Sequence, residues 1–561
     1  MTVTTPGAPG RVGSFARLRG LLPSARDYAA VGTTWRADLA AGLTVGIVAL
    51  PLALGFGISS GLTAEAGLVT AVVAGMLAAF FGGSPVQVSG PTGAMVVVLV
   101  PIVAVHGPAT VAVVTLLAGI MVVAGGLLGL GRAVSFIPWP VVEGFTLGIA
   151  AIIFLQQVPL LTSPHVSAAS GHATSAVVGA VDAAVHADPV YLAWAGAVVV
   201  VVAGCMMLAP RVHRAVPGSL VGIIAVTVVA SVAASPLSVI GPLPAGLPAP
   251  TLPQVDAAAL PSLLVPAATV AVLAAIESLL SARVAASLAD TGPYDPDREL
   301  VGQGIASVGA SLFGGMPATG AIARTAVNVT SGGRSRLASA THAVVLLVIV
   351  LVLSAPVAQI PLPALAAVLM VTAIRMVHAG TVRALLRSTR SDALAFVLTA
   401  AITVSVDLIV AVGIGVLLAT VFSLRSLARR AGVQREAVWG PSAPGDERIA
   451  IIRFDGPLFF AAADRVFERV SELSEVSVVI LRMSQVELVD ATGARILSDI
   501  VQTLERRGVT VLIKGVQPRH ADLFRRIGLL AALRHQNHLF DSLPDAVAHA
   551  RSHVRREAAS A

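Results

Sequence analysis

The chain has 561 residues, of which 56% are hydrophobic and only 12% charged, whereas a typical soluble protein has roughly 25% charged residues. The charges are unevenly distributed. Residues 38–428 contain 13 basic and 13 acidic side chains, whereas residues 429–561 contain 19 basic and 16 acidic ones. The first region is too apolar for a soluble domain, so the composition predicts a membrane region followed by a soluble tail.

The net charge of +7 does not indicate nucleic-acid binding, because the basic residues are scattered in short loops and aromatic residues make up only 4%. The single cysteine, Cys205, lies in an apolar run, which excludes a disulfide framework and a cysteine metal site. The 12 histidines show no ligand-like spacing, so we expect no metal and no cofactor. No apolar stretch precedes residue 36, so no signal peptide is expected.

Apolar runs predict fourteen membrane segments, since a helix needs about 20 mostly apolar residues to cross the hydrocarbon core. Three of these segments, 91–105, 300–314 and 319–332, are too short to cross alone. The others cover residues 38–60, 64–82, 109–131, 137–158, 190–209, 217–235, 262–289, 337–355, 361–377, 391–405 and 407–428.

The distribution of arginine supports this count, because cytoplasmic loops carry an excess of basic residues. With the amino terminus inside, loops after even-numbered segments face the cytoplasm, and the opposite loops contain neither Lys nor Arg. We therefore expect a multi-pass protein of the cytoplasmic membrane with both termini in the cytoplasm. The cytoplasmic loops contain Arg132, Arg211, Arg214, Arg298, Arg334, Arg336, Arg383, Arg387 and Arg390.

A short motif recurs in the two halves of the membrane region. Segment three opens with Gly90-Pro91-Thr92-Gly93-Ala94, and segment ten opens with Pro317-Ala318-Thr319-Gly320-Ala321. The two segments are seven apart, an odd number, so the halves must have opposite orientations. Paired broken segments of this kind indicate the midplane site of a transporter. The alternative is chance recurrence in a sequence rich in Ala, Gly and Thr.

Two half-helices that start inside the membrane would direct unpaired N–H groups and positive dipole ends at one point, which favours an anion. Gly93 and Gly320 allow a ligand to approach the backbone, and Thr92 and Thr319 offer hydroxyls. Arg324 lies about one turn beyond Gly320. A guanidinium inside a membrane segment is costly and usually functional, although a snorkelling or structural Arg324 is the alternative.

Glu277 is the other conspicuous charge, since the preceding dozen residues of its segment carry none. Buried carboxylates tend to become neutral by protonation, which suits a group that couples transport to protons or another cation. Ser281 follows by four residues on the same helix face and could help to coordinate a ligand or ion. A structural ion pair of Glu277 with Arg283 or Arg324 is the alternative.

Longer stretches resemble a known family. The first segment opens with WRADLAAGLTVG (residues 35–46) and continues to Leu50-Pro51, while the second half contains IESLL (276–280), ELVGQG (299–304) and FGGMPATGAIART (313–325). These stretches are similar to those of the sulfate permease (SulP) anion transporters. Leu52 stands where many relatives have glutamine, which argues against sulfate in particular, and the Glu277 motif looks more like the bicarbonate and C4-dicarboxylate branches.

The resemblance implies a fold of fourteen membrane segments in two inverted seven-helix repeats, with a core domain that rocks against a gate domain, and commonly a homodimer. It places substrate between segments three and ten, with segments one and eight as walls. The implied substrate residues are Thr92, Gly93, Ala318, Thr319, Gly320 and Arg324, with Phe56, Glu277 and Ser281 lining the site.

The soluble tail alternates predicted strands (448–454, 476–483 and 509–514) with predicted helices (464–473 and 492–507), which favours an α/β domain. Val489-Asp490-Ala491-Thr492-Gly493 resembles the strand-to-helix turn of STAS domains, where related proteins carry a phosphorylated serine. The resemblance implies a regulatory role for Asp490 and Thr492. Both are also ordinary residues for a helix start, which is the simpler interpretation.

We therefore expect a secondary active transporter of a small inorganic or carboxylate anion, coupled to protons or sodium and working by alternating access. The alternatives are an uncoupled channel or exchanger and a nucleobase permease of the same fold; no constellation suggests an enzyme. We expect a cytoplasmic segment at 1–37, the transporter domain at 38–428, a linker at 429–446 and a cytoplasmic STAS domain at 447–556.

Overall fold

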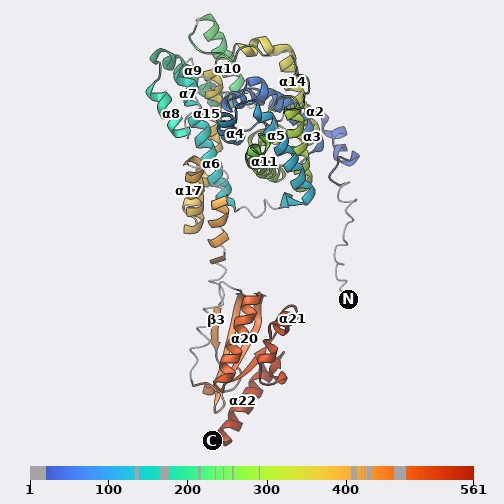
Figure 1. Ribbon diagram of the computed structural model, residues 1–561, viewed down its shortest axis with the longest axis vertical. Helices are drawn as coiled ribbons and strands as arrows, with labels where there is room; N and C mark the ends of the chain where they lie inside the picture. The colour runs from blue at the N-terminus through green and yellow to red at the C-terminus, as the bar shows by residue number, and fades with distance from the viewer. Residues whose placement is uncertain are drawn as a thin grey trace. The chain divides into compact units, whose positions relative to one another are not determined.

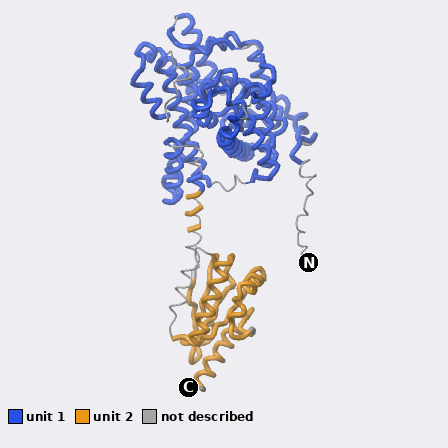
Figure 2. The backbone as a smooth tube through the Cα atoms, viewed as in Figure 1, with its two compact units in different colours: residues 1–416 blue, residues 417–561 orange. Residues whose placement is uncertain are grey.

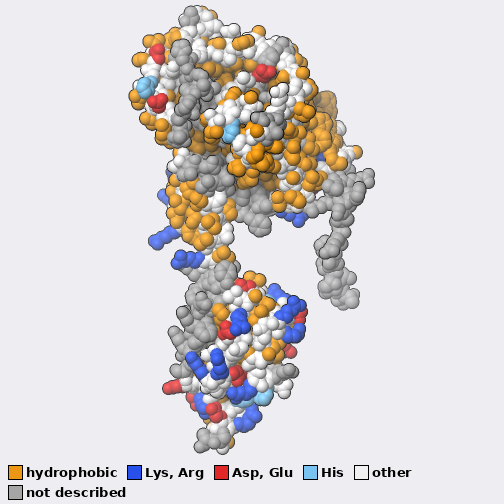
Figure 3. Space-filling view, viewed as in Figure 1, with side chains coloured by type: hydrophobic (Ala, Val, Ile, Leu, Met, Phe, Trp, Pro, Cys, Tyr) orange, Lys and Arg blue, Asp and Glu red, His pale blue; other side chains and the backbone are white. Residues whose placement is uncertain are grey.

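The chain divides into two compact units, residues 1–416 and 417–561 (Figure 2). Hydrophobic side chains are abundant on the visible face of the first unit, whereas charged side chains are concentrated on the second (Figure 3). This difference is the one predicted from composition. The computed structural model describes residues 20–560 apart from 133–137, 164–175, 213–216, 234, 244–245, 255–257, 290, 406–412, 419, 423, 426–431 and 460–474.

The first unit is built almost entirely of helices (Figure 1). Among the described residues, eight helices are long and apolar enough to cross a membrane. Thirteen of the fourteen predicted segments coincide with helices. Half of the last, 407–428, lies outside the described residues, and its described part includes the short apolar helix Gly413–Phe422. The thirteen are α2 (Val31–Ser59), α3 (Ala64–Phe81), α4 (Gly93–His106), α5 (Thr110–Leu128), α6 (Trp139–Gln156), α9 (Pro189–Val212), α10 (Gly218–Val232), α11 (Leu260–Leu288), α12 (Pro296–Leu312), α13 (Ile322–Thr330), α14 (Arg336–Ala358), α15 (Leu362–Met376) and α17 (Arg390–Ser405).

Four short helical elements were not predicted, because each is too short to register as a membrane segment. They connect or extend the longer helices. These elements are η1 (Ala25–Tyr28), α7 (Val158–Thr162), α8 (Ala176–Val185) and α16 (Ala379–Leu386).

Helices from the two sequence halves interleave. The α5 helix packs against α12 from the other half, and α14 packs against α2 and α3. At the α5–α12 contact the backbones are so close that a Cβ atom added to Gly119 would lie 2.8 Å from the Gly304 carbonyl oxygen. Small residues permit such approach between membrane helices. A second group, α6, α9, α10, α15 and α17, packs mainly within itself, which matches the expected division into core and gate.

The two broken segments meet in a two-stranded sheet. Strand β1 (Ser89–Gly90) leads into α4, and strand β2 (Thr319–Gly320) leads into α13. The strands are antiparallel, with Ser89 opposite Gly320 and Gly90 opposite Thr319. Because lipid offers no hydrogen bonds, non-helical backbone at membrane depth must be paired inside the protein. The sheet provides this pairing and brings the amino ends of α4 and α13 together.

The second unit contains a five-stranded sheet in the order β3-β4-β5-β6-β7, in which only the β3–β4 pair is antiparallel. The predicted strands and one predicted helix are confirmed, while the helix predicted at 464–473 lies outside the described residues. Two separate hydrophobic clusters form around the sheet, one with α20 and one with α22. The elements are β3 (Gly432–Glu436), β4 (Ile449–Leu458), β5 (Val478–Val489), α20 (Ala491–Arg506), β6 (Thr510–Lys514), α21 (Pro518–Ile527), β7 (Leu539–Phe540) and α22 (Leu543–Ser560).

Candidate functional site

Three side chains from distant segments converge where the two half-helices begin. Thr92 precedes α4, Thr319 lies in β2, and Glu277 projects from α11. The Thr92 hydroxyl donates to Oε2 of Glu277 at 2.8 Å, and the Thr319 hydroxyl lies 2.7 Å from the same oxygen. The two hydroxyl oxygens are 3.0 Å apart. A single carboxylate oxygen therefore joins the two repeat motifs.

The amino ends of both half-helices lack a side-chain cap. Thr92 is the N-cap residue of α4, but its hydroxyl is directed to Glu277 and forms no capping hydrogen bond. Ala321 is the N-cap residue of α13 and has no capping side chain. Uncapped first-turn N–H groups carry the positive end of the helix dipole. The Glu277 carboxylate thus lies where two helix starts favour negative charge.

Arg324 is buried, with 2% of its surface exposed, although it carries a guanidinium. Its Nη2 donates to the carbonyl oxygen of Pro91, just before α4. Its Nη1 is also buried, but it has no hydrogen-bond partner among the described residues. A buried donor without a partner is costly. Arg324 thus makes one structural contact through Nη2, while Nη1 lies against Gly90 without a partner among the described residues.

Glu277 makes its hydrogen bonds to threonine rather than to arginine. Its side chain is only partly buried, although Thr92 is 6% exposed and Thr319 is fully buried. Arg283 is exposed on α11, so the alternative of a buried Glu277–Arg283 pair does not fit the described contacts.

The remaining predicted lining residues occupy two different places. Gly93 faces α6, where an added Cβ would clash with Ile153 Cδ1 and lie 3.4 Å from Cε1 of Phe56. Ser281 is fully buried and lies 3.3 Å from the hydroxyl of Thr325. Gly93 therefore lies where α4 meets α6 and Phe56 of α2, whereas Ser281 supports α13.

Ala318 and Gly320, on either side of Thr319 in the chain, form hydrogen bonds through their backbone N–H groups. The Ala318 N–H donates to the Ser307 hydroxyl at 3.3 Å, and the Gly320 N–H donates to the Ser278 hydroxyl at 3.1 Å. A side chain at Gly320 would overlap the amide of Gln87. These contacts hold β2 in place, and they leave the threonine hydroxyls as the groups that reach Glu277.

Sequence reasoning missed several polar residues that build this site. One is Ser278, which accepts the hydrogen bond from Gly320. Another is Gln87, whose two side-chain amide atoms are buried without partners among the described residues. Asn328 donates to the Val86 carbonyl oxygen at 2.8 Å, and Thr325 accepts from the Val88 N–H at 3.0 Å. Asn328 follows Arg324 by four residues and Thr325 by three, so the three side chains share one face of α13. This spacing was the signal available in the sequence.

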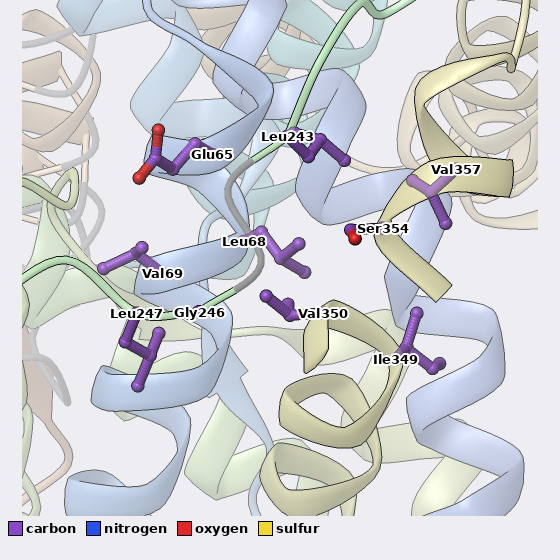
Figure 4. Close-up of a pocket in the computed structure, with 10 residues that line it drawn as sticks. All are labelled: Glu65, Leu68, Val69, Leu243, Gly246, Leu247, Ile349, Val350, Ser354 and Val357. Atoms are coloured by element: carbon purple, nitrogen blue, oxygen red, sulfur yellow. The ribbon is translucent and has the colours of Figure 1, made fainter. Parts of the chain in front are cut away.

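The cavity in Figure 4 lies elsewhere in the first unit. Its volume is about 10 Å³, and its lining includes Glu65 and Leu68 of α3 together with Ile349 and Ser354 of α14. This volume is close to that of one water molecule. None of the predicted site residues lines the cavity, so it is not the candidate anion site.

Asp490 and Thr492 begin α20 in the second unit. Asp490 is the N-cap residue, and its carboxylate accepts from the Gly493 N–H at 2.7 Å. Thr492 is exposed in the first turn. Asp490 thus acts as a helix cap, and the hydroxyl of Thr492 is accessible from solvent.

Comparisons with known proteins support one family. Residues 35–399 match the sulfate permease family, and residues 440–546 match the STAS domain. The chain is 35% identical over 515 residues to the putative sulfate transporter YvdB of Bacillus subtilis, covering 90% of this chain and 96% of YvdB. It is 31% identical over 504 residues to the bicarbonate transporter BicA of Synechocystis sp., covering 85% and 88%.

Solved structures agree with the fold. The overall structure of SLC26A9 covers 99% of this chain and 98% of its own with a TM-score of 0.79 at 17% identity. The transmembrane domain of a cyanobacterial BicA covers 68% of this chain and 98% of its own, with a TM-score of 0.60 and 34% identity. The matched relatives are transporters rather than enzymes. The chain belongs to the sulfate permease family of membrane transporters and carries a STAS domain at its carboxyl end.

Proposed function

We propose that this chain transports a small anion, held between the amino ends of α4 and α13, by alternating access. The observation that carries the proposal is the convergence of Thr92 and Thr319 on one oxygen of Glu277, beside the unpartnered Nη1 of Arg324. Helix dipoles, hydroxyls and a guanidinium together suit an oxyanion. In this proposal Thr92, Gly93, Thr319 and Arg324 form its binding site, and Gly320 supports the site by holding β2 in place.

The charge balance of this site favours coupling to a cation. Arg324 and Glu277 carry opposite charges, so a bound anion leaves the site with a net negative charge. In a medium of low dielectric, uncompensated charge is expensive. A proton on Glu277, or a sodium ion between its carboxylate and the threonine hydroxyls, restores the balance. Glu277 is accordingly the coupling residue, and cation and anion bind together.

The candidate substrates are sulfate, bicarbonate and a small carboxylate. Relatives are named for sulfate and for bicarbonate, and both anions present oxygens to N–H and guanidinium donors. Leu52 is buried and has no polar group that could help to bind the doubly charged sulfate ion. This favours an anion of lower charge. Bicarbonate is the first candidate on this basis.

Uptake into proteoliposomes tests the proposed function. Purified protein is reconstituted, and labelled bicarbonate, sulfate and succinate are offered with or without an inward sodium or proton gradient. Accumulation of one anion above its external concentration, only when one gradient is present, is the expected result. Rapid equilibration without accumulation would indicate a channel or exchanger, and uptake of labelled uracil that competes with no anion would indicate a nucleobase permease.

We further propose that the protein lies in the cytoplasmic membrane as a homodimer, with residues 38–428 as transporter domain and residues 447–556 as STAS domain in the cytoplasm. The basic loops support this orientation. Cysteines introduced at Arg387 and at Asp182 test it. A membrane-impermeant maleimide applied to intact cells should label position 182 and spare position 387, and the reverse pattern would contradict the orientation.

A further inference from the structure

Three histidines of the carboxyl-terminal unit lie close together, far from the transport site in sequence. His538 ends the short helix η6 (Gln536–His538), and His549 and His553 lie on α22. One ring nitrogen from each histidine lies within 4.8 Å of the other two. The ring centroids are 4.9 Å apart for His549 and His553, and 5.5 Å and 5.6 Å from His538 to each of them.

The spacing of two of these nitrogens fits a shared metal ion. His549 and His553 are four residues apart and lie on one face of α22. Their Nε2 atoms are 3.2 Å apart. Two imidazole nitrogens bound to one tetrahedral zinc at about 2.0–2.1 Å are separated by about 3.3 Å. The ligand nitrogen of His538 lies within 4.8 Å of the other two, so its ring has to move closer to them to complete a three-histidine set.

Burial sets one of the three rings apart from solvent. His538 is 2% exposed, and its Nδ1 is buried without a hydrogen-bond partner among the described residues. His549 and His553 are half-buried on α22. A buried imidazole nitrogen without a partner is a candidate ligand, because metal ions bind neutral imidazole.

Ring packing alone is the simpler explanation, and nearby arginines oppose a cation. Arg534 lies near His553 but is paired with Glu505 at 3.3 Å, and Arg556 donates to the Ser552 carbonyl oxygen. Packing does not explain a buried nitrogen without a partner, since an unmet polar group is costly. The 3.2 Å contact between the Nε2 atoms of His549 and His553 is a hydrogen bond in this structure, and a bound metal ion would replace it with two metal–nitrogen bonds.

We propose that His538, His549 and His553 form a binding site for a divalent transition-metal ion of the zinc class, with water in the fourth position. Imidazole nitrogen suits zinc, copper and nickel, and three protein ligands with one water form an open tetrahedral site. Such an ion would connect α22 to β7, the edge strand that follows His538. Metal binding would then stabilise the carboxyl-terminal end of the domain.

Calorimetry with zinc chloride tests the site on the full chain, purified without a histidine tag and treated with a chelator. We expect one zinc ion per chain with a Kd below about 10 μM. His549→Gln and His538→Gln should each weaken binding by at least about tenfold. His186→Gln, which removes an exposed histidine of the first unit, is the matched control and should bind zinc as the parent does. Unchanged binding in both cluster variants would overturn the proposal.

Hydrogen exchange on the unmodified chain keeps the test valid if a variant fails to fold. Zinc should slow exchange in peptides from residues 536–556 and leave those from α4 and α13 unchanged. Cobalt in place of zinc should give the intense visible absorption of a tetrahedral site. No slowing in residues 536–556 at saturating zinc, or slowing confined to the first unit, would contradict the assignment.

Discussion

Arg324 combines a structural contact with the ligand-binding role that we propose for it. Its Nη2 donates to the carbonyl oxygen of Pro91, and its Nη1 has no partner among the described residues. A lysine ammonium could not replace this arrangement, because only the planar guanidinium holds its donors in fixed directions. The residue was recognised in the sequence as a costly charge in an apolar segment. The different surroundings of Nη1 and Nη2 could not be recognised there, because they depend on the sheet that positions Pro91.

Replacing Arg324 with alanine should raise the Kd for the transported anion by about tenfold or more, because charge-assisted hydrogen bonds are lost. Arg324→Lys should restore the charge but only part of the affinity. Binding is measured by scintillation proximity with the labelled anion, and Arg283→Ala, an exposed arginine on α11, is the control. Equal affinity in the alanine variant and the parent would remove Arg324 from the site.

Asp27 gives a second prediction for a single residue, outside the membrane segments. Its carboxylate is 3.0 Å from the guanidinium of the buried Arg298. Burial of Asp27 opposes ionisation, but hydrogen bonds from Arg298 and Ser24 and the charge of Arg298 outweigh it and lower the pKa to about 2. A lowered carboxyl pKa contributes stability above the unfolded value, and this stability is lost as pH falls through the folded value.

Asp27→Asn should therefore reduce stability at neutral pH, on the order of 1 kcal/mol, since the exchange leaves Arg298 without its anionic partner. The difference in Tm between parent and variant should be constant from pH 8 to about 5 and shrink below about pH 4. Thermal unfolding in detergent at a series of pH values measures it. A difference that grows with acid would have the wrong sign for this ion pair.

The sheet formed by β1 and β2 was predicted only in part from the sequence. The repeated Pro-Thr-Gly and Ala-Thr-Gly motifs predicted two broken segments with opposite orientations. The sequence could not predict that residues 89–90 pair with 319–320, because two-residue strands carry no alternating pattern and the pairing joins distant parts of the chain. In the same way, the helices α8 and α16 were too short to be recognised.

Gly93 gives a prediction for the α4–α6 contact. An added methyl group at Gly93 would clash with Ile153 of α6, so Gly93→Ala should prevent α4 and α6 from closing to their present distance. Overpacking of this kind costs about 1–3 kcal/mol, enough to slow transport about tenfold. Ile153→Ala removes the clashing atoms, so the Gly93→Ala, Ile153→Ala double variant should recover transport. Uptake rates measure both, and no recovery in the double variant would show that Gly93 acts through something other than this contact.

For the whole molecule, composition and charge were sufficient to separate a membrane unit from a soluble one. Apolar runs predicted the number of segments, and the basic loops supported it, because a wrong count would have mixed basic and uncharged loops. The interleaving of α5 with α12 and of α14 with α3 depends on packing between small residues, which the sequence shows only as frequent Gly and Ala. The sequence analysis overlooked the histidine cluster. The four-residue spacing of His549 and His553 was visible in the sequence, but His538 meets α22 only in the folded domain.

The central claim is that an anion and a neutralising cation bind together at the two helix ends beside Glu277. Accumulation of the transported anion by proteoliposomes under an imposed cation gradient, compared between the parent and Glu277→Gln, tests it most directly. We predict that Glu277→Gln inserts normally and loses gradient-driven accumulation, whereas Glu143→Gln at the start of α6 retains it. Accumulation by Glu277→Gln with the same dependence on pH and sodium as the parent would contradict the account.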